Sequence, residues 1–205
     1  MCQFLSVLIL KNGDVLHHPM LDSHSDLVTY FSLPDTSSYV SHFAKAELTP
    51  VNYLDASTWQ WRIDEPTRPS WLDDVEAIAE AKARAIAQKM IIATGAKCLI
   101  VDGCWIVGGD AVVQDVRGGR IIHVGDSAQI TDVRDSAQIT NVGDSAQITN
   151  VWGSARITDV RDSAQITNVW GSARITNVWD SAQITDVGGS AQLDASAEAH
   201  VKAGA

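Results

Sequence analysis

The sequence lacks any apolar run long enough to cross a membrane and contains only three cysteines, Cys2, Cys98 and Cys104. An odd, low cysteine count argues against a disulfide-stabilised secreted domain and favours a reducing cytoplasm. The spacing of Cys98 and Cys104 fits no zinc-ligand pair, and both lie in apolar, strand-like sequence, so we expect buried thiols. The apolar stretch at residues 4–10 is short and has no basic region before it, which predicts a strand rather than a signal peptide.

A basic surface is also missing. The chain has 25 acidic and 15 basic residues, a formal net charge of −10, and its acidity is shared evenly between the two halves. This balance disfavours direct nucleic-acid binding and binding to anionic membranes. The sequence contains no phosphate-binding glycine motif and no nucleophile elbow. We therefore predict a protein that is not an enzyme and that needs no cofactor.

Residues 1–95 predict a small α+β domain. Strands are expected over residues 3–10 and 14–18, joined by a hairpin turn at Asn12–Gly13, and a short helix capped by Asp22 or Ser23 is expected to run to Phe31. Further strands are predicted over Tyr39–Leu48 and Thr58–Ile63. A long helix should begin at Ser70, capped with Asp73, and end near Thr94–Gly95, with Glu80 paired to Arg84. The expected core contains Trp59, Trp61 and Trp71.

One group in this half has the composition of a metal site: His17, His18, Asp22 and His24. A solvated strand end and turn explains the same residues more simply, so no metal is predicted there. An enzyme or metal-binding head on a repeat scaffold remains an alternative that rests on this group alone.

Residues 124–190 are a tandem array of a nine-residue unit, as in VGDSAQITD and VWGSARITN. Within each unit Ser-Ala-Gln-Ile-Thr alternates like a strand, with Ala and Ile on one side and Ser, Gln and Thr on the other. A single unit cannot bury its Ala, Ile and Val, but stacked copies can, so the array predicts an all-β solenoid. Val107–Asp115, and Val116–His123 with one residue deleted, resemble earlier units. Residues 96–123 are therefore predicted as irregular capping coils, 124–196 as the solenoid and 197–205 as a tail.

Variation within the units indicates that two of them make one coil. The third position is Asp in every odd unit and Gly in three of the four even units, which predicts a true period of 18 residues. Duplication of an 18-residue gene segment would produce the same alternation.

A two-strand coil has two unlike faces. One face would stack Gln residues above Asp126, Asp144, Asp162 and Asp180, and the other would carry Arg156 and Arg174, edged by Arg134, Trp152 and Trp170. On the opposite edge Arg161 precedes Trp179 by one coil, and an Arg below a Trp favours a cation–π contact. Stacked like charges disfavour such columns. Each Asp could be satisfied by backbone N–H groups of its own bend, or a partner could supply the counter-charge.

We predict a non-enzymatic interaction protein that inhibits or scaffolds a partner protein, because Trp and Arg dominate binding hot spots. The predicted contact residues are the Asp, Arg and Trp residues just named. Mimicry of nucleic acid by the Asp column is a variant of this hypothesis. An ice- or carbohydrate-binding solenoid is a second alternative, supported by seven Thr in register but opposed by the Ser, Gln and Arg beside them. The ligand pattern of calcium β-rolls is missing.

The segments FAKAELTP and TWQWRIDEPTRPSW, followed by short Gly/Asp-Ser-Ala-x-Ile repeats, resemble uncharacterised proteins from phages and bacterial mobile elements. The resemblance covers most of the chain. It implies a cytoplasmic setting in a bacterium or a phage-infected host, where small acidic proteins often inhibit host or defence enzymes. That step is an analogy. An open last coil near residue 195 would be covered by the tail or paired with a second chain as a homodimer.

Overall fold

The computed structural model describes residues 5–34, 42–194 and 200–203, and the chain divides into two units, Met1–Met90 and Ile91–Ala205. The first unit combines strands with helices and the second is a parallel β-solenoid. The predicted α+β region followed by an all-β solenoid is confirmed. The division falls after Met90 rather than after residue 95, because Ile91 and Ile92 already pair with the solenoid strand that contains Ile106.

The first unit is built on a four-stranded antiparallel sheet of order β2-β1-β3-β4. Its strands are β1 (Leu5–Leu10), β2 (Val15–Leu16), β3 (Phe43–Thr49) and β4 (Gln60–Ile63), and its helices are α1 (His24–Tyr30), α2 (Glu76–Lys89) and the short 3₁₀ helices η1 (Ala56–Thr58) and η2 (Leu72–Asp74). The β1–β2 hairpin turns at Gly13, which adopts φ 77°. Ser23 caps α1 as predicted, accepting a hydrogen bond from the backbone N–H of Asp26. Residues 39–41 of the predicted third strand lie outside the described residues.

Helix α2 begins later than predicted. Its N-cap is Val75, which makes no side-chain capping bond, and the Ser70 prediction is wrong. Asp73 accepts a hydrogen bond from Arg68 instead, at 2.7 Å, so its carboxylate serves an ion pair rather than a capping box. The buried face of α2 is a stripe of small residues, Ala79, Ala83 and Ala87, which allows the helix to pack closely. The predicted Glu80–Arg84 ion pair forms at 2.6 Å.

Of the three tryptophans predicted in the first core, only Trp59 is fully buried, with 1% of its surface exposed. Trp61 and Trp71 are half-buried, and Trp61 donates a hydrogen bond to Glu76 at 3.0 Å. Their indole rings therefore lie at the margin of the core, where the N–H of Trp61 reaches a carboxylate.

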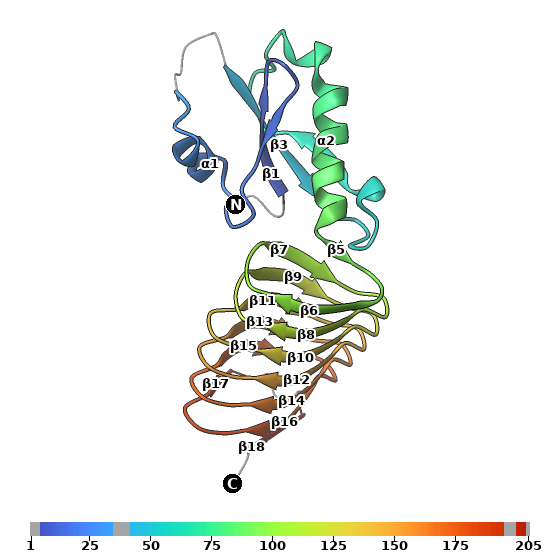
Figure 1. The fold of residues 1–205 in the computed structure, drawn as a ribbon, viewed down its shortest axis with the longest axis vertical. Helices are drawn as coiled ribbons and strands as arrows, with labels where there is room; N and C mark the ends of the chain where they lie inside the picture. Colours follow the sequence, from blue (N-terminus) through green and yellow to red (C-terminus); the bar gives the residue numbers. More distant parts are fainter. Residues whose placement is uncertain (1–4, 35–41, 195–199, 204–205) are drawn as a thin grey trace. The chain divides into compact units, whose positions relative to one another are not determined.

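The second unit contains two seven-stranded parallel sheets, seen as successive rungs in Figure 1. One sheet, here called the even sheet, has the order β18-β16-β14-β12-β10-β8-β6, and the odd sheet has the order β17-β15-β13-β11-β9-β7-β5. The strands are β5 (Ile91–Ile92), β6 (Ala96–Ile100), β7 (Cys104–Val107), β8 (Val112–Val116), β9 (Arg120–Val124), β10 (Gln129–Val133), β11 (Gln138–Val142), β12 (Gln147–Val151), β13 (Arg156–Val160), β14 (Gln165–Val169), β15 (Arg174–Val178), β16 (Gln183–Val187), β17 (Gln192–Leu193) and β18 (His200–Ala203). Gln129 pairs with Gln147, and Arg156 with Arg174. Two nine-residue units therefore form each coil, as predicted.

The solenoid interior is a column of Ala, Ile and Val from every unit. Ala128, just before β10, and Ile130 and Val133 within it are each at most 1% exposed, and the same positions repeat through Ile184. Small and branched apolar residues fill a narrow interior without polar atoms, so the strand alternation read from the sequence gives the observed core.

The coils turn at two corners through residues with positive φ. At the corner before each even strand, Asp126, Asp144, Asp162 and Asp180 have φ between 53° and 58°. At the corner before each odd strand, Asp135 is followed along the stack by Gly153, Gly171 and Gly189, with φ between 57° and 71°. Asp and Gly are the residues that tolerate this left-handed conformation at low cost, which explains their alternation in the array.

The predicted capping coils continue both sheets through strands β6 to β9, with Gln129 paired to Val112 and Gln138 to Arg120. They are irregular as predicted at one point, because the pairing of β7 with β9 shifts register between Trp105 and Ile106. The tail also extends the solenoid, because β18 pairs in parallel with β16. Cys104 is buried as predicted, but Cys98 is exposed because it lies on the outer face of β6.

Candidate functional site

The predicted contact residues of the solenoid divide between its two corners. Arg134, Trp152 and Trp170 lie at the corner before the odd strands, next to Arg156 and Arg174 on the odd sheet. We call these five residues the Arg/Trp surface. The four Asp residues, Arg161 and Trp179 lie at the corner before the even strands.

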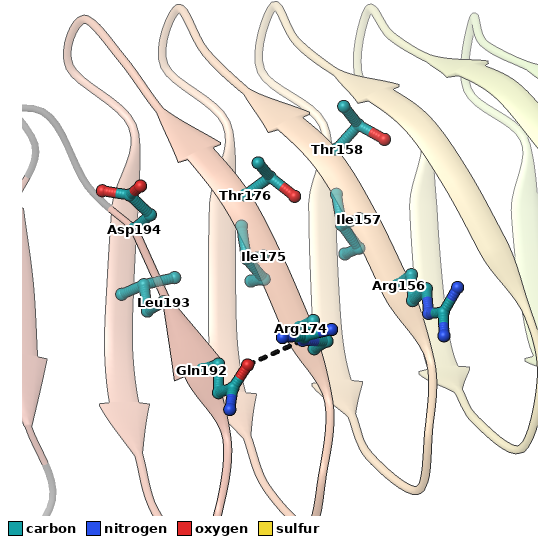
Figure 2. A pocket seen from close by; sticks show the side chains of 9 residues that line it. All are labelled: Arg156, Ile157, Thr158, Arg174, Ile175, Thr176, Gln192, Leu193 and Asp194. Atoms are coloured by element: carbon teal, nitrogen blue, oxygen red, sulfur yellow. Dashed lines mark hydrogen bonds between the residues drawn. The ribbon is translucent and has the colours of Figure 1, made fainter.

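Arg156 and Arg174 occupy the same position on adjacent strands of the odd sheet. A groove of about 490 Å³ runs beside them and is also lined by Thr158, Thr176 and Gln192 (Figure 2). Arg174 donates a hydrogen bond to Gln192 at 2.7 Å. Within the described part of the chain neither arginine forms an ion pair. Among the described residues the two positive charges are therefore not paired with a carboxylate, although Asp194 also lines the groove.

The tryptophans of this corner are exposed and packed along the stack. The guanidinium of Arg134 lies 5.2 Å from the ring centroid of Trp152, which is the predicted cation–π contact. The Trp170 ring lies over Gly188 of the next coil, where an added Cβ would come within 2.8 Å of it. Trp152 and Trp170 remain 42% and 46% exposed. Each ring therefore packs against a neighbouring coil and still keeps nearly half of its surface exposed.

Asp115 holds Arg134 in place beneath Trp152. It accepts a hydrogen bond from Nε of Arg134 at 2.8 Å and another from Nε of Arg117 at 2.7 Å. The hydrogen bond from Arg134 is the main cause that lowers the pKa of Asp115 below its ordinary value, and Arg117 contributes in the same direction. Asp115 is thus a positioning residue for the Arg/Trp surface.

This ion pair predicts a dependence of stability on pH. Because the folded protein lowers the pKa of Asp115, its contribution to the free energy of unfolding is present above the ordinary value of 3.8 and is lost as the pH falls through the lower folded value. We expect Asp115→Asn to be less stable than the wild type at neutral pH and equal to it in strong acid. Urea denaturation followed by circular dichroism at both pH values checks this. A stability difference that is the same at both pH values would contradict it.

The Asp column at the opposite corner has a structural role. The carboxylate of Asp126 accepts from the backbone N–H of Gly109, Asp144 from that of Asp126, and Asp162 from that of Asp144, at 2.9–3.1 Å. The next step, from Asp162 N–H to Asp180, measures 3.2 Å. The expectation that each Asp binds its own bend is wrong, since the acceptor belongs to the following coil. These charges are stabilised without any ligand.

The predicted pairing of Arg161 with Trp179 does not form a cation–π contact among the described residues. Nε of Arg161 lies 3.7 Å from a carboxylate oxygen of the neighbouring Asp162 instead, because the Asp column runs along the same corner. Trp179 is 49% exposed. At this corner the arginine is therefore paired with the Asp column rather than with a tryptophan.

Arg120 belongs to the arginine column but was not among the predicted contact residues. It pairs with Gln138, which in turn pairs with Arg156, so it lies two coils before Arg156 on the same face. The deleted residue in the unit Val116–His123 obscures this register in the sequence. The deletion lies in the corner between Val116 and Gly119, since the N–H of Gln138 donates to the Gly119 carbonyl as the N–H of Arg156 does to the Ala137 carbonyl. Placing it there would have revealed the register.

The repeated Thr residues point outward in register, and Gln or Arg accompanies them on every strand. Long polar side chains alternate with the Thr rows, so the faces are not flat arrays of small hydroxyl-bearing residues. This geometry gives the ice-binding alternative no further support.

The histidine-rich group of the first unit does not come together. His18 packs against Tyr30, with ring centroids 4.6 Å apart, and its Nδ1 accepts from the N–H of Met20. Burial lowers the pKa of His17, which is half-buried. His24 alone enters a group of potential ligands, with Glu47 and Asp64, whose ligand atoms all lie within 4.8 Å of one another.

No protein-family model matches the chain, and no curated protein or solved structure matches it significantly. No helix in the described ranges is long and apolar enough to cross a membrane.

Proposed function

We propose that the solenoid is a non-enzymatic protein-binding module whose Arg/Trp surface takes an acidic segment of a partner protein. The observation that carries the proposal is the combination of two stacked arginines, which form no ion pair with any described residue, and two exposed tryptophans on one side of a chain with net charge −10. Arginine recognises carboxylates through paired hydrogen bonds, and tryptophan supplies buried contact area at the centre of interfaces.

The spacing of the arginines favours an extended ligand. Adjacent strands of a sheet lie about 4.8 Å apart, so the backbone positions of Arg156 and Arg174 follow each other at that interval along the groove. Carboxylates from an acidic loop or strand can reach both. Inhibition or scaffolding of the partner would follow from occupying that segment.

The Asp column is unsuited to mimicry of nucleic acid. The Asp column carries one charge per coil, about 4.8 Å apart, whereas duplex DNA carries one charge per about 1.7 Å. Its carboxylates also accept hydrogen bonds from their own backbone.

The array itself offers conservative variants for a test. Gln occupies the position of Arg156 and Arg174 in the strands containing Gln138 and Gln192, so Arg156→Gln/Arg174→Gln preserves the fold. We expect fluorescently labelled acidic peptides that contain an aromatic residue to bind the wild type in a saturable, salt-sensitive manner. The double variant should weaken binding by about tenfold or more.

A charge-matched control moves the same two arginines to the other sheet. Adding Gln147→Arg and Gln165→Arg to the double variant restores the net charge but places the arginines on the even sheet. This control should not restore binding. Recovery of binding by the control, or equal binding by the double variant and the wild type, would show that net charge or another surface is responsible. Capture from a bacterial lysate with the same three proteins, and with alanine at Trp152 and Trp170, then identifies the partner.

A further inference from the structure

We propose that His24, Glu47 and Asp64 form a binding site for a divalent transition-metal ion of the Zn²⁺ class in the first unit. The three residues come from different elements: His24 begins α1, Glu47 lies on β3, and Asp64 follows β4 directly. The β3–β4 register, in which Glu47 faces Arg62, and the hydrogen bond from Asp64 N–H to the Lys45 carbonyl fix the two carboxylates.

The hydrogen bonds of His24 assign its ring nitrogens. Nε2 lies 3.0 Å from the carbonyl oxygen of Ala46, which can only accept, so Nε2 carries the hydrogen. Nδ1 lies 3.2 Å from Oδ2 of Asp64, which as a carboxylate also only accepts. In a neutral imidazole, two lone pairs would then face each other. Either a second proton on the ring or a metal ion between the two atoms removes this conflict.

Several features favour the metal ion. A histidine ligand typically donates its other N–H to a backbone carbonyl, as His24 does to Ala46. Two ligands of one tetrahedral zinc, each about 2.1 Å from the ion, lie roughly 3.4 Å apart, close to the 3.2 Å between Nδ1 and Oδ2. One imidazole and two carboxylates are ligands that zinc accepts, with water completing the shell.

The burial of the group gives the ion a closed side and an open side. His24 and Glu47 are 6% and 8% exposed, whereas the side chain of Asp64 is 42% exposed, so solvent reaches the group past Asp64. Arg62 competes for the carboxylates, at 2.9 Å from Glu47 and 3.5 Å from Asp64. Its side chain is 65% exposed, so it can turn into solvent when a cation binds.

The rival arrangement is an ion network in which a protonated His24 and Arg62 neutralise the two carboxylates. The two arrangements differ in how they respond to Arg62→Gln. If a metal ion binds, Arg62→Gln should bind it as tightly as the wild type or more tightly, because a competing positive charge is removed. If the ion network is present instead, Arg62→Gln should only lower the free energy of unfolding.

The test uses the full chain, which is first treated with a chelator and then titrated with Co²⁺. Zn²⁺ is then added to displace the bound Co²⁺. We expect binding of one ion, with visible ligand-field bands and without sulfur charge-transfer absorption, which excludes the exposed Cys98 as ligand. Loss of a direct ligand should exceed the 10–100-fold effect of losing an outer partner, so His24→Ala and Asp64→Asn should each weaken binding by more than about 100-fold. His42→Ala, at an exposed position outside the group, should bind normally.

Circular dichroism separates loss of the site from loss of the fold. If His24→Ala unfolds the unit, Asp64→Asn still tests the proposal, because its side chain is partly exposed and of the same size. The proposal is overturned if the wild type binds neither ion, or if folded Asp64→Asn binds as tightly as the wild type.

Discussion

Replacing Ala146 with aspartate is expected to unfold the central coils of the solenoid. Ala146 is fully buried in the interior column, where its neighbours are Ala, Ile and Val. An aspartate there would overpack a narrow core and bury a carboxylate without a partner, and such changes belong to the class that costs about 4 kcal/mol or more. Guanidinium denaturation followed by circular dichroism measures the loss, and amide hydrogen exchange locates it around β12.

The matched control is Thr149→Asp, three residues along the same nine-residue unit. Thr149 is exposed on the outer face of β12, so the same charge should change the free energy of unfolding by no more than about 0.5 kcal/mol. If the two variants were equally stable, the interior column would not be the source of the solenoid's stability.

The second large effect is expected at Asp144, which combines a left-handed backbone with a bond to the preceding coil. Its φ is 53°, and its carboxylate accepts from the backbone N–H of Asp126 at 3.0 Å. Asp144→Ala removes the acceptor and strains the backbone, since this conformation costs alanine about 1–2 kcal/mol. The lost hydrogen bond adds little because it is exposed to solvent. We therefore expect the free energy of unfolding to fall by about 2 kcal/mol in all.

Two further substitutions at Asp144 separate these causes. Asp144→Asn keeps an acceptor and tolerates positive φ, so it should remain close to the wild type. Asp144→Gly keeps the conformation but not the acceptor, and should lie between Asn and Ala. Urea denaturation of the series measures the order. An alanine variant as stable as the asparagine variant would show that the Asp column does not stabilise the stack.

The repeat made most of the solenoid predictable. Strict alternation of Ala and Ile with Ser, Gln and Thr determines which side chains are buried, and the alternation of Asp with Gly correctly indicated two strands per coil. Since the period fixes the register, neighbours 18 residues apart could be named from the sequence, including Arg156 with Arg174. The contact of Arg134 with Trp152 followed in the same way.

Details that depend on side-chain direction were not predictable. The repeat does not indicate whether the Asp144 carboxylate accepts a hydrogen bond from its own bend or from the preceding coil. That difference decides whether its charge is available to a partner. The stacking of Trp170 on Gly188 depends on the same unseen direction. In the first unit, His24, Glu47 and Asp64 come together only through the pairing of β3 with β4 and the position of α1. Local sequence contains no signal of such long-range contacts.

The direction of the Asp column has a consequence for how the chain is completed during synthesis. In four successive coils a corner N–H donates to the aspartate of the following coil, as the N–H of Asp144 does to Asp162. Chains emerge from the ribosome amino-terminus first, so every newly made coil stabilises the one already folded beneath it. The solenoid is therefore suited to growth from its amino-terminal end, because each added coil supplies the hydrogen-bond acceptor for the corner N–H of the coil before it.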